Sequence, residues 1–178
     1  MITFEYLELR NIASQNNATM GSDHPCSRGK ADCCRTDLLL ADSDADYIRE
    51  GIQHGDISRQ TLDSAKERAR KGKKVCPFLS EDKECTIYER RPLICIATGT
   101  MAIPTNANDA SIMKYSADEG GIGLPFSKLS SSMCKGCHST LAKQGKGVSA
   151  QGLRDSQEIG RYYGEHVTIL MSQLIAEL

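Results

Sequence analysis

Hydrophobic and polar positions alternate most regularly at the end of the chain, over residues 149–178. The apolar residues there recur at steps of three and four, which is the spacing of one face of an α-helix. We predict a single C-terminal helix over 149–178, whose apolar stripe packs in a core or against another subunit. The stripe consists of Tyr163, Val167, Leu170, Met171, Leu174 and Leu178.

Two shorter segments in the first half of the chain also carry helical signals. The segment 43–54 starts on a serine that can cap a helix, and Gly55 follows it as a stop signal. The segment 56–72 carries one apolar stripe and ends on Gly72. Both are predicted to be helices, with inner faces formed by Tyr47, Ile48 and Ile52 and by Leu62, Ala65 and Ala69.

Other stretches carry weaker periodic signals. Residues 1–11 alternate loosely between apolar and polar positions and are expected to form a short strand or a docked arm. Residues 12–35 are polar, rich in turn-forming residues and end on two cysteines, which favours a binding loop. Residues 99–132 are rich in glycine, proline and serine, so we expect mostly loop with one short helix.

A compact β-hairpin is predicted around the segment CPFLSEDKECTIY. Val75–Leu79 resembles a short strand, Ser80–Glu84 a charged turn and Thr86–Tyr88 a return strand. A hairpin of this kind is a common way to present two thiolates to one metal ion. The predicted fold class is therefore mainly α: a small cysteine-rich helical domain with a short β-hairpin and metal-organised loops.

We expect one domain over residues 1–178, because this length is enough for one sizeable hydrophobic core. Within it, a cysteine-rich core over 26–95 is followed by a loop-rich region over 96–148 and by the helix over 149–178. Apolar content of 39% and charged content of 25% are ordinary for a globular protein. The net charge of −1 leaves no basic surplus to neutralise phosphates, so no nucleic-acid partner is predicted.

The chain contains no apolar run long enough to span a membrane, and its start does not resemble a secretory signal. We therefore expect a cytoplasmic protein, in a reducing compartment where stable disulfides are rare. Eight cysteines in such a chain indicate metal ligands or redox groups. The alternative is that each cysteine is a small buried hydrophobic residue.

The cysteines form three groups with the spacings C-x6-C-C, C-x8-C-x9-C and C-x2-C, and all eight are candidate metal ligands: Cys26, Cys33, Cys34, Cys76, Cys85, Cys95, Cys134 and Cys137. The C-x2-C group lets a tight turn direct two sulfurs at one ion, although redox dithiols use the same spacing. Adjacent side chains in an extended segment point to opposite sides. The pair Cys33–Cys34 therefore indicates two metals, a bridging thiolate or one buried spectator.

Other residues near the cysteines carry supporting chemistry. A zinc ion with four thiolates has a net charge of about −2, and such a buried anion needs compensation from cations or backbone N–H groups. Either His24 or His138 can replace one thiolate in a mixed site. The candidate cations are Arg28, Lys30, Arg35, Arg90, Arg91 and Lys135.

The cysteine pattern resembles the YkgJ-type cysteine-cluster family, which is described as a zinc- or iron-chelating domain. That family carries a C-x2-C-x2-C-C cluster followed by C-P-x-L and C-x-I-Y-x-x-R-P-x-x-C. Here Cys76–Leu79 and Cys85–Cys95 match the second part, and Cys33–Cys34 match the closing pair of the first, so the resemblance covers roughly residues 26–95. The family's second cysteine is missing, and Ile96 stands where the family often has arginine.

The resemblance implies a bound metal or iron–sulfur centre in a mostly bacterial, cytoplasmic group. A metal–thiolate module with a structural or sensing role is the first hypothesis, with zinc preferred and an iron–sulfur cluster as the alternative. The flagellin lysine methylases are similar in their cysteine motif, which keeps open an iron–sulfur-dependent group-transfer (methyltransferase-like) enzyme. Its cosubstrate site would have to use the glycine-rich string Gly120–Gly123. A thiol oxidoreductase based on Cys134 and Cys137 would need a thioredoxin-like βαβ context, for which the sequence gives no signal.

Overall fold

The computed structural model describes residues 1–20, 34, 37–72, 75–97, 113–116, 121–122, 147–148 and 150–178. The chain divides into two compact units, which we describe separately. The first comprises Met1–Tyr6, Arg28–Pro92 and Glu165–Leu178. The second comprises Leu7–Ser27 and Leu93–Gly164.

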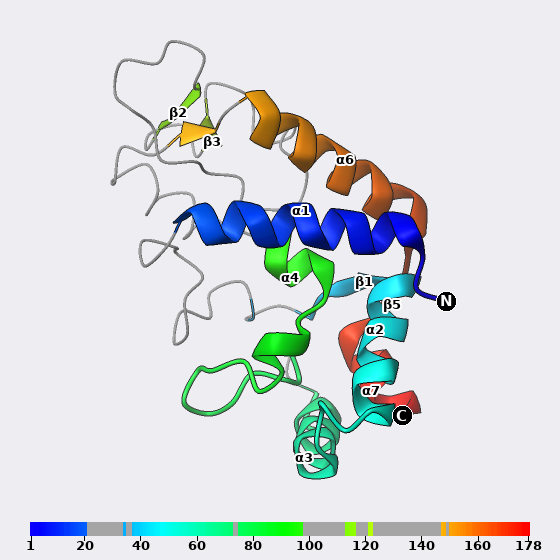
Figure 1. The fold of residues 1–178 in the computed structure, drawn as a ribbon. Helices are drawn as coiled ribbons and strands as arrows, with labels where there is room; N and C mark the ends of the chain where they lie inside the picture. The colour runs from blue at the N-terminus through cyan, green and yellow to red at the C-terminus, as the bar shows by residue number, and fades with distance from the viewer. Residues whose placement is uncertain are drawn as a thin grey trace. The chain divides into compact units, whose positions relative to one another are not determined.

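The first unit combines a two-stranded antiparallel sheet with short helices (Figure 1). Its strands are β1 (Leu39–Ala41) and β5 (Val167–Leu170), paired with Leu39 opposite Leu170 and Leu40 opposite Ile169. Helix α2 packs against both strands, and α3 packs against α7. The helices are α2 (Asp42–Gln53), α3 (Arg59–Arg70), the 3₁₀-helix η3 (Tyr88–Arg90) and α7 (Met171–Glu177).

Helices α2 and α3 confirm the two short helices predicted from the sequence. The stop signals are correct, because Gly55 and Gly72 have φ angles of +81° and +65°, which favour glycine. The start of α3 is capped by Ser58, whose hydroxyl accepts a hydrogen bond from the amide of Thr61 at 3.1 Å. At the start of α2 the predicted cap is wrong, since it is the Asp44 carboxylate that accepts from the Ala41 amide, at 3.4 Å.

The core of the first unit is built by side chains that the helical stripes and the sheet bring together. Ile48 of α2 is fully buried, and Leu62 and Ala65 of α3 are buried as predicted. Tyr6 is also buried, and its hydroxyl donates to the Asp44 carboxylate at 2.7 Å, so this buried charge has a hydrogen-bond partner. Further buried apolar residues of this unit are Leu40, Phe78, Met171, Leu174 and Ile175.

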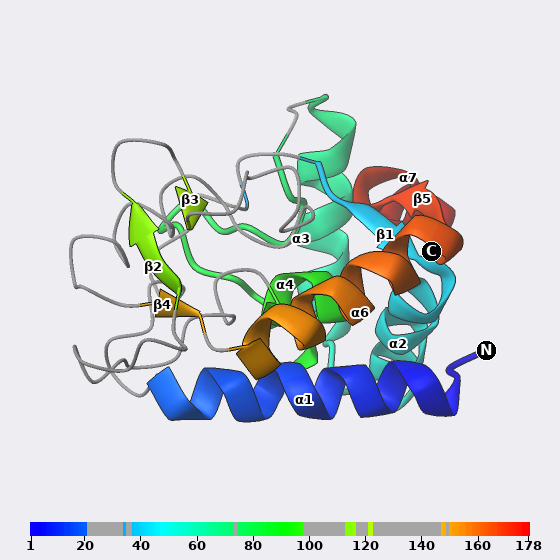
Figure 2. The same ribbon diagram turned by 90° about the horizontal axis from the view of Figure 1, so that it is seen from above.

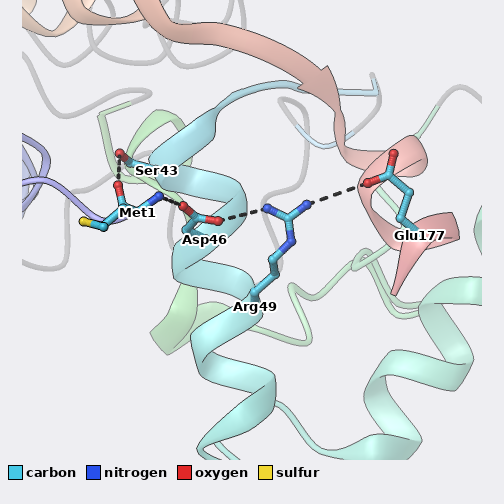
Figure 3. A network of polar contacts seen from close by, with 5 residues as sticks. All are labelled: Met1, Ser43, Asp46, Arg49 and Glu177. Atoms are coloured by element: carbon cyan, nitrogen blue, oxygen red, sulfur yellow. Dashed lines mark hydrogen bonds and ion pairs between the residues drawn. The ribbon is translucent and has the colours of Figure 1, made fainter.

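A polar network joins the first residue of the described chain to α2 and α7 (Figure 3). The Met1 ammonium pairs with the Asp46 carboxylate, which also accepts from Arg49 at 2.9 Å. Arg49 extends to Glu177 on α7, with a nitrogen–oxygen distance of 3.7 Å. The pKa of Asp46 lies below its ordinary value of 3.8, because the hydrogen bond from the Met1 ammonium and that from Arg49 outweigh the opposite effect of burial.

This network predicts an acid-sensitive contribution to stability. A carboxyl with a lowered pKa in the folded state stabilises the fold above its ordinary pKa and loses this effect as the pH falls through the folded value. Asp46→Asn should therefore reduce the difference in unfolding free energy between about pH 6 and about pH 3, measured by urea denaturation. Asp63→Asn, at an exposed position of α3, is the control and should keep the wild-type difference. An unchanged pH dependence in Asp46→Asn would contradict this role.

The second unit holds most of α1 (Phe4–Met20), α4 (Leu93–Ala97) and most of α6 (Ala150–His166). The amide of Ile94 in α4 donates to the hydroxyl of Tyr163 in α6 at 2.7 Å, a buried bond that ties the two helices together. Strand β2 (Met113–Ser116) lies between β3 (Gly121–Ile122) and β4 (Gly147–Val148), antiparallel to both (Figure 2). Buried apolar residues of this unit include Leu9, Ala13, Leu93, Ile96, Ala97, Ile159 and Tyr162.

The prediction of a strand or arm at residues 1–11 is wrong, as is the irregular loop at the start of 12–35, because α1 runs through both. Tyr6, Leu9 and Ala13 are buried and follow each other at steps of three and four. This helical spacing was hidden by the additional apolar side chains Phe4 and Leu7, which are exposed. Residues 21–33 of the predicted binding loop lie outside the described residues.

The single helix predicted over 149–178 is also wrong. The chain forms α6, then β5, then α7. The interruption falls on the run Val167-Thr168-Ile169, whose β-branched side chains favour extended backbone and which pairs with β1. Of the predicted stripe, Tyr163, Met171 and Leu174 are nevertheless buried, because they face the core from the two separate helices.

The fold class is confirmed as mainly helical and small, with short antiparallel pairing. Within the ranges that the structure describes, no helix combines the length and apolar character required to cross a bilayer. The predicted loop at 99–132 lies outside these ranges except for β2 and β3. The division into a cysteine-rich core over 26–95 and a loop-rich region over 96–148 stays a prediction.

Candidate metal centre

The central cysteine group begins with a tight turn in the first unit. The Cys76 carbonyl accepts from the Leu79 amide at 3.0 Å, and the Ser80 amide donates to the Glu84 carbonyl at 2.8 Å. Leu79 and Cys85 form an isolated antiparallel bridge. The predicted hairpin is therefore reduced to one bridge, because Pro77 has no amide for a longer ladder.

The expected return strand at Thr86–Tyr88 is wrong, since Tyr88–Arg90 form η3. The Arg90 amide donates to the Ile87 carbonyl at 2.9 Å, which closes this helical turn. Arg91 is extended, as expected for a residue that precedes proline. The chain thus leaves the cysteine turn as a 3₁₀-helix followed by Pro92.

Phe78 fixes the position of this turn. Its side chain is fully buried. Its carbonyl accepts from both the amide and the hydroxyl of Thr86, at 2.9 and 3.0 Å. An aromatic side chain in the core and two hydrogen bonds across the turn hold Cys76 and Cys85 at the two ends of one ordered loop.

The structure brings the main chains of two of the three cysteine groups together. The Cys76 amide donates to the Cys34 carbonyl at 2.9 Å, so the end of the first group lies directly against the start of the second. Cys76 is buried, with 4% of its surface exposed, and Cys34 and Cys85 are partly exposed. Cys95 lies in α4, within the second unit.

The other four candidate cysteines, Cys26, Cys33, Cys134 and Cys137, lie outside the described residues, as do His24 and His138. Across the described ranges alone, no three His, Cys, Asp or Glu side chains gather closely enough to hold a metal ion. A complete ligand set therefore needs residues beyond those ranges. Of the glycine-rich string Gly120–Gly123, the structure describes Gly121 and Ile122, which form β3.

Cys85 lies on the wall of a cavity of about 340 Å³ within the first unit. The same wall carries Thr86, Glu89 and the ion pair between Arg90 and Asp56. One thiol of the group is thus buried and one borders an open, polar cavity. This difference gives Cys85 the easier access to ions from solvent.

Two of the predicted counter-cations are engaged elsewhere. Arg90 pairs with Asp56 and lies 4.9 Å from the ring centre of Tyr47. Burial acts to lower the pKa of Arg90, but the hydrogen bond with Asp56 raises it overall. Arg91 lies 3.6 Å from the ring centre of Tyr88 and donates to the Tyr88 carbonyl at 2.9 Å. Arg28, Lys30, Arg35 and Lys135 lie outside the described residues.

The structure identifies a cation beside the cysteine turn that was missed in the sequence. Arg68 of α3 donates from Nε to the Pro77 carbonyl at 2.6 Å. Its Nη2 atom is buried and has no hydrogen-bond partner among the residues that the structure describes. The helical spacing already indicated that this side chain lies at the edge of the core, because position 68 follows Ala65 by three residues and so borders the buried stripe. Surrounded by other charges, it resembled an ordinary surface arginine.

These features fit a metal bound by thiolates. The candidate donors are cysteines, which bind zinc and iron–sulfur clusters as anions. A buried guanidinium nitrogen next to Pro77 that lacks an acceptor in the described ranges is the kind of donor that a neighbouring anionic centre would satisfy. The described residues would contribute a thiolate such as that of Cys76 and a cation from Arg68, and the remaining ligands would come from cysteines outside the described ranges.

Comparison with known families defines the class of this chain. A family model named CxxCxxCC, described as "Putative zinc- or iron-chelating domain", matches residues 25–117, more than half of the 178 residues. The chain belongs to this family, which confirms the resemblance seen in its cysteine motifs. No match to this chain was found among the curated proteins or among the solved structures.

Proposed function

We propose that this protein binds zinc through cysteine thiolates and that the bound ion orders the cysteine loops. The family description supports metal chelation by zinc or iron. The observation that carries the proposal is the hydrogen bond between the Cys76 amide and the Cys34 carbonyl, because it joins two separate cysteine groups at one place. The ligands are drawn from the eight cysteines, and the protein acts in the cytoplasm.

Zinc is favoured over an iron–sulfur cluster by the local backbone. Structural zinc sites use tight turns that each supply two thiolates, and the turn from Cys76 to Cys85 has this character. The C-x2-C spacing of Cys134 and Cys137 is also typical of such sites. The cysteine spacings match neither standard ferredoxin arrangement. A structural or sensing role follows from the same chemistry. The partly exposed thiol of Cys85 can bind or release a metal ion or react with an oxidant, while Cys76 stays buried.

Purification without oxygen tests this proposal. The protein should be colourless and should carry one or two zinc ions per chain by elemental analysis, because a tetrahedral zinc site uses four thiolates. A brown protein with broad visible absorbance and bound iron would show that the cofactor is an iron–sulfur cluster and not zinc. A protein free of both metals in its purified state, which also fails to take up zinc, would contradict metal binding as its function.

A further inference from the structure

Arg68 presents an unusual electrostatic situation in the first unit. One nitrogen, Nε, donates to the Pro77 carbonyl at 2.6 Å, and another, Nη2, is buried and finds no acceptor within the described part of the chain. A buried donor left without a partner destabilises the folded state, and the more so when it belongs to a charged group. Structures rarely retain such a group unless ordered water, a ligand or an ion satisfies it.

The helix alone does not account for this arrangement. Arg68 lies in the last turn of α3, where a cation is favoured by the negative end of the helix dipole. Arg70 lies in the same turn and gains the same benefit while staying exposed. The dipole thus explains a basic residue at the end of α3, but it does not explain why the partly buried guanidinium of Arg68 is held against the residue that follows Cys76.

The contact places the guanidinium beside the main chain of the thiolate group. Pro77 directly follows Cys76, and the Cys76 amide donates a hydrogen bond to the Cys34 carbonyl. A centre of several thiolates and one divalent ion carries net negative charge, which in a partly buried place needs a nearby cation. The other described arginines near this turn, Arg90 and Arg91, are occupied by Asp56 and Tyr88.

We infer that Arg68 is a positioning residue of the metal centre: its guanidinium holds the Pro77 carbonyl and compensates the negative charge of the thiolates. This inference rests on the proposed function. Residues around metal ligands commonly change metal affinity by about 10–100-fold when they are replaced. The effect should depend on the positive charge of the side chain and to a smaller extent on its hydrogen bond to Pro77.

The test compares Arg68→Lys with Arg68→Gln in the full chain. Both side chains can donate one hydrogen bond, but only lysine keeps the charge. Zn²⁺ affinity is measured by competition with a coloured chelator, and Arg70→Gln is the matched control from the same helical turn. We expect Arg68→Gln to weaken Zn²⁺ binding about 10-fold or more, Arg68→Lys to stay within about 3-fold of the wild type and Arg70→Gln to leave it unchanged.

Equal losses in Arg68→Lys and Arg68→Gln would overturn the inference, because a merely structural hydrogen bond would make the two variants alike. Wild-type affinity in Arg68→Gln would overturn it as well. Either result leaves the proposed function standing as long as the wild-type chain binds Zn²⁺. Failure of the wild type to bind Zn²⁺ is a separate outcome that removes the proposed function and the inference together.

Discussion

Replacing Cys76 with serine is expected to release the bound metal and to lower the melting temperature of the protein to that of the chelator-treated wild type. Cys76 is buried and joins the first two cysteine groups through its amide. Binding of a metal to the folded state alone adds about 4 kcal/mol at a free concentration of about 1,000 times Kd. For a chain of this length, such a loss lowers the melting temperature by about 10 °C.

The control for Cys76→Ser is the response to a chelator. A strong chelator should lower the melting temperature of the wild type by about 10 °C and leave Cys76→Ser nearly unchanged, because the variant has no metal to lose. Elemental analysis measures the metal content of both. If Cys76→Ser kept the wild-type metal content and the same response to the chelator, Cys76 would be a buried hydrophobic residue and not a ligand.

The second large effect is expected at Phe78, between the two cysteines of the turn. Phe78→Ala should lower the free energy of unfolding by about 3–5 kcal/mol, since it removes a fully buried aromatic side chain and leaves a cavity. The loss should be present with and without metal, because the packing of Phe78 does not depend on the ion. Urea denaturation in saturating Zn²⁺ and in chelator measures the two values.

Leu39→Ala is the matched control for Phe78→Ala. Leu39 belongs to the same unit but is 54% exposed, so its replacement should change the free energy of unfolding by less than about 0.5 kcal/mol. A cost below 1 kcal/mol for Phe78→Ala would contradict the view that this residue anchors the cysteine turn.

Much of the local structure could be predicted where the signals were themselves local. Helices α2 and α3 were predicted because each has a clear apolar stripe and a terminal glycine that adopts positive φ, at Gly55 and Gly72. The two wrong predictions, at the N-terminal segment and at the C-terminal segment, have different causes. Exposed apolar side chains, Phe4 and Leu7, obscured the helical spacing of α1.

The strand β5 depends on a partner that is distant in the sequence. Val167–Leu170 continue an apolar helical stripe, and pairing with Leu39–Ala41 stabilises the extended form. A pattern read along one segment contains no information on such a partner. The β-branched run was the only local indication.

The candidate site shows the same division. Cysteine spacing predicts the thiols as metal ligands, because ligands of one ion often lie a few residues apart in the sequence. Arg68 could not be assigned a role in this way, since its contact with Pro77 arises only when α3 packs beside the cysteine turn. Arg90 was considered a counter-cation from its position near Cys95, whereas the fold directs it to Asp56.

X-ray absorption at the metal edge of the purified protein tests the central claim most directly, because it counts the atoms bound to the ion. We expect about four sulfur neighbours at about 2.3 Å, and fewer in Cys76→Ser. A spectrum described by nitrogen and oxygen neighbours alone, at about 2.0–2.2 Å, would show that the cysteines do not hold the metal.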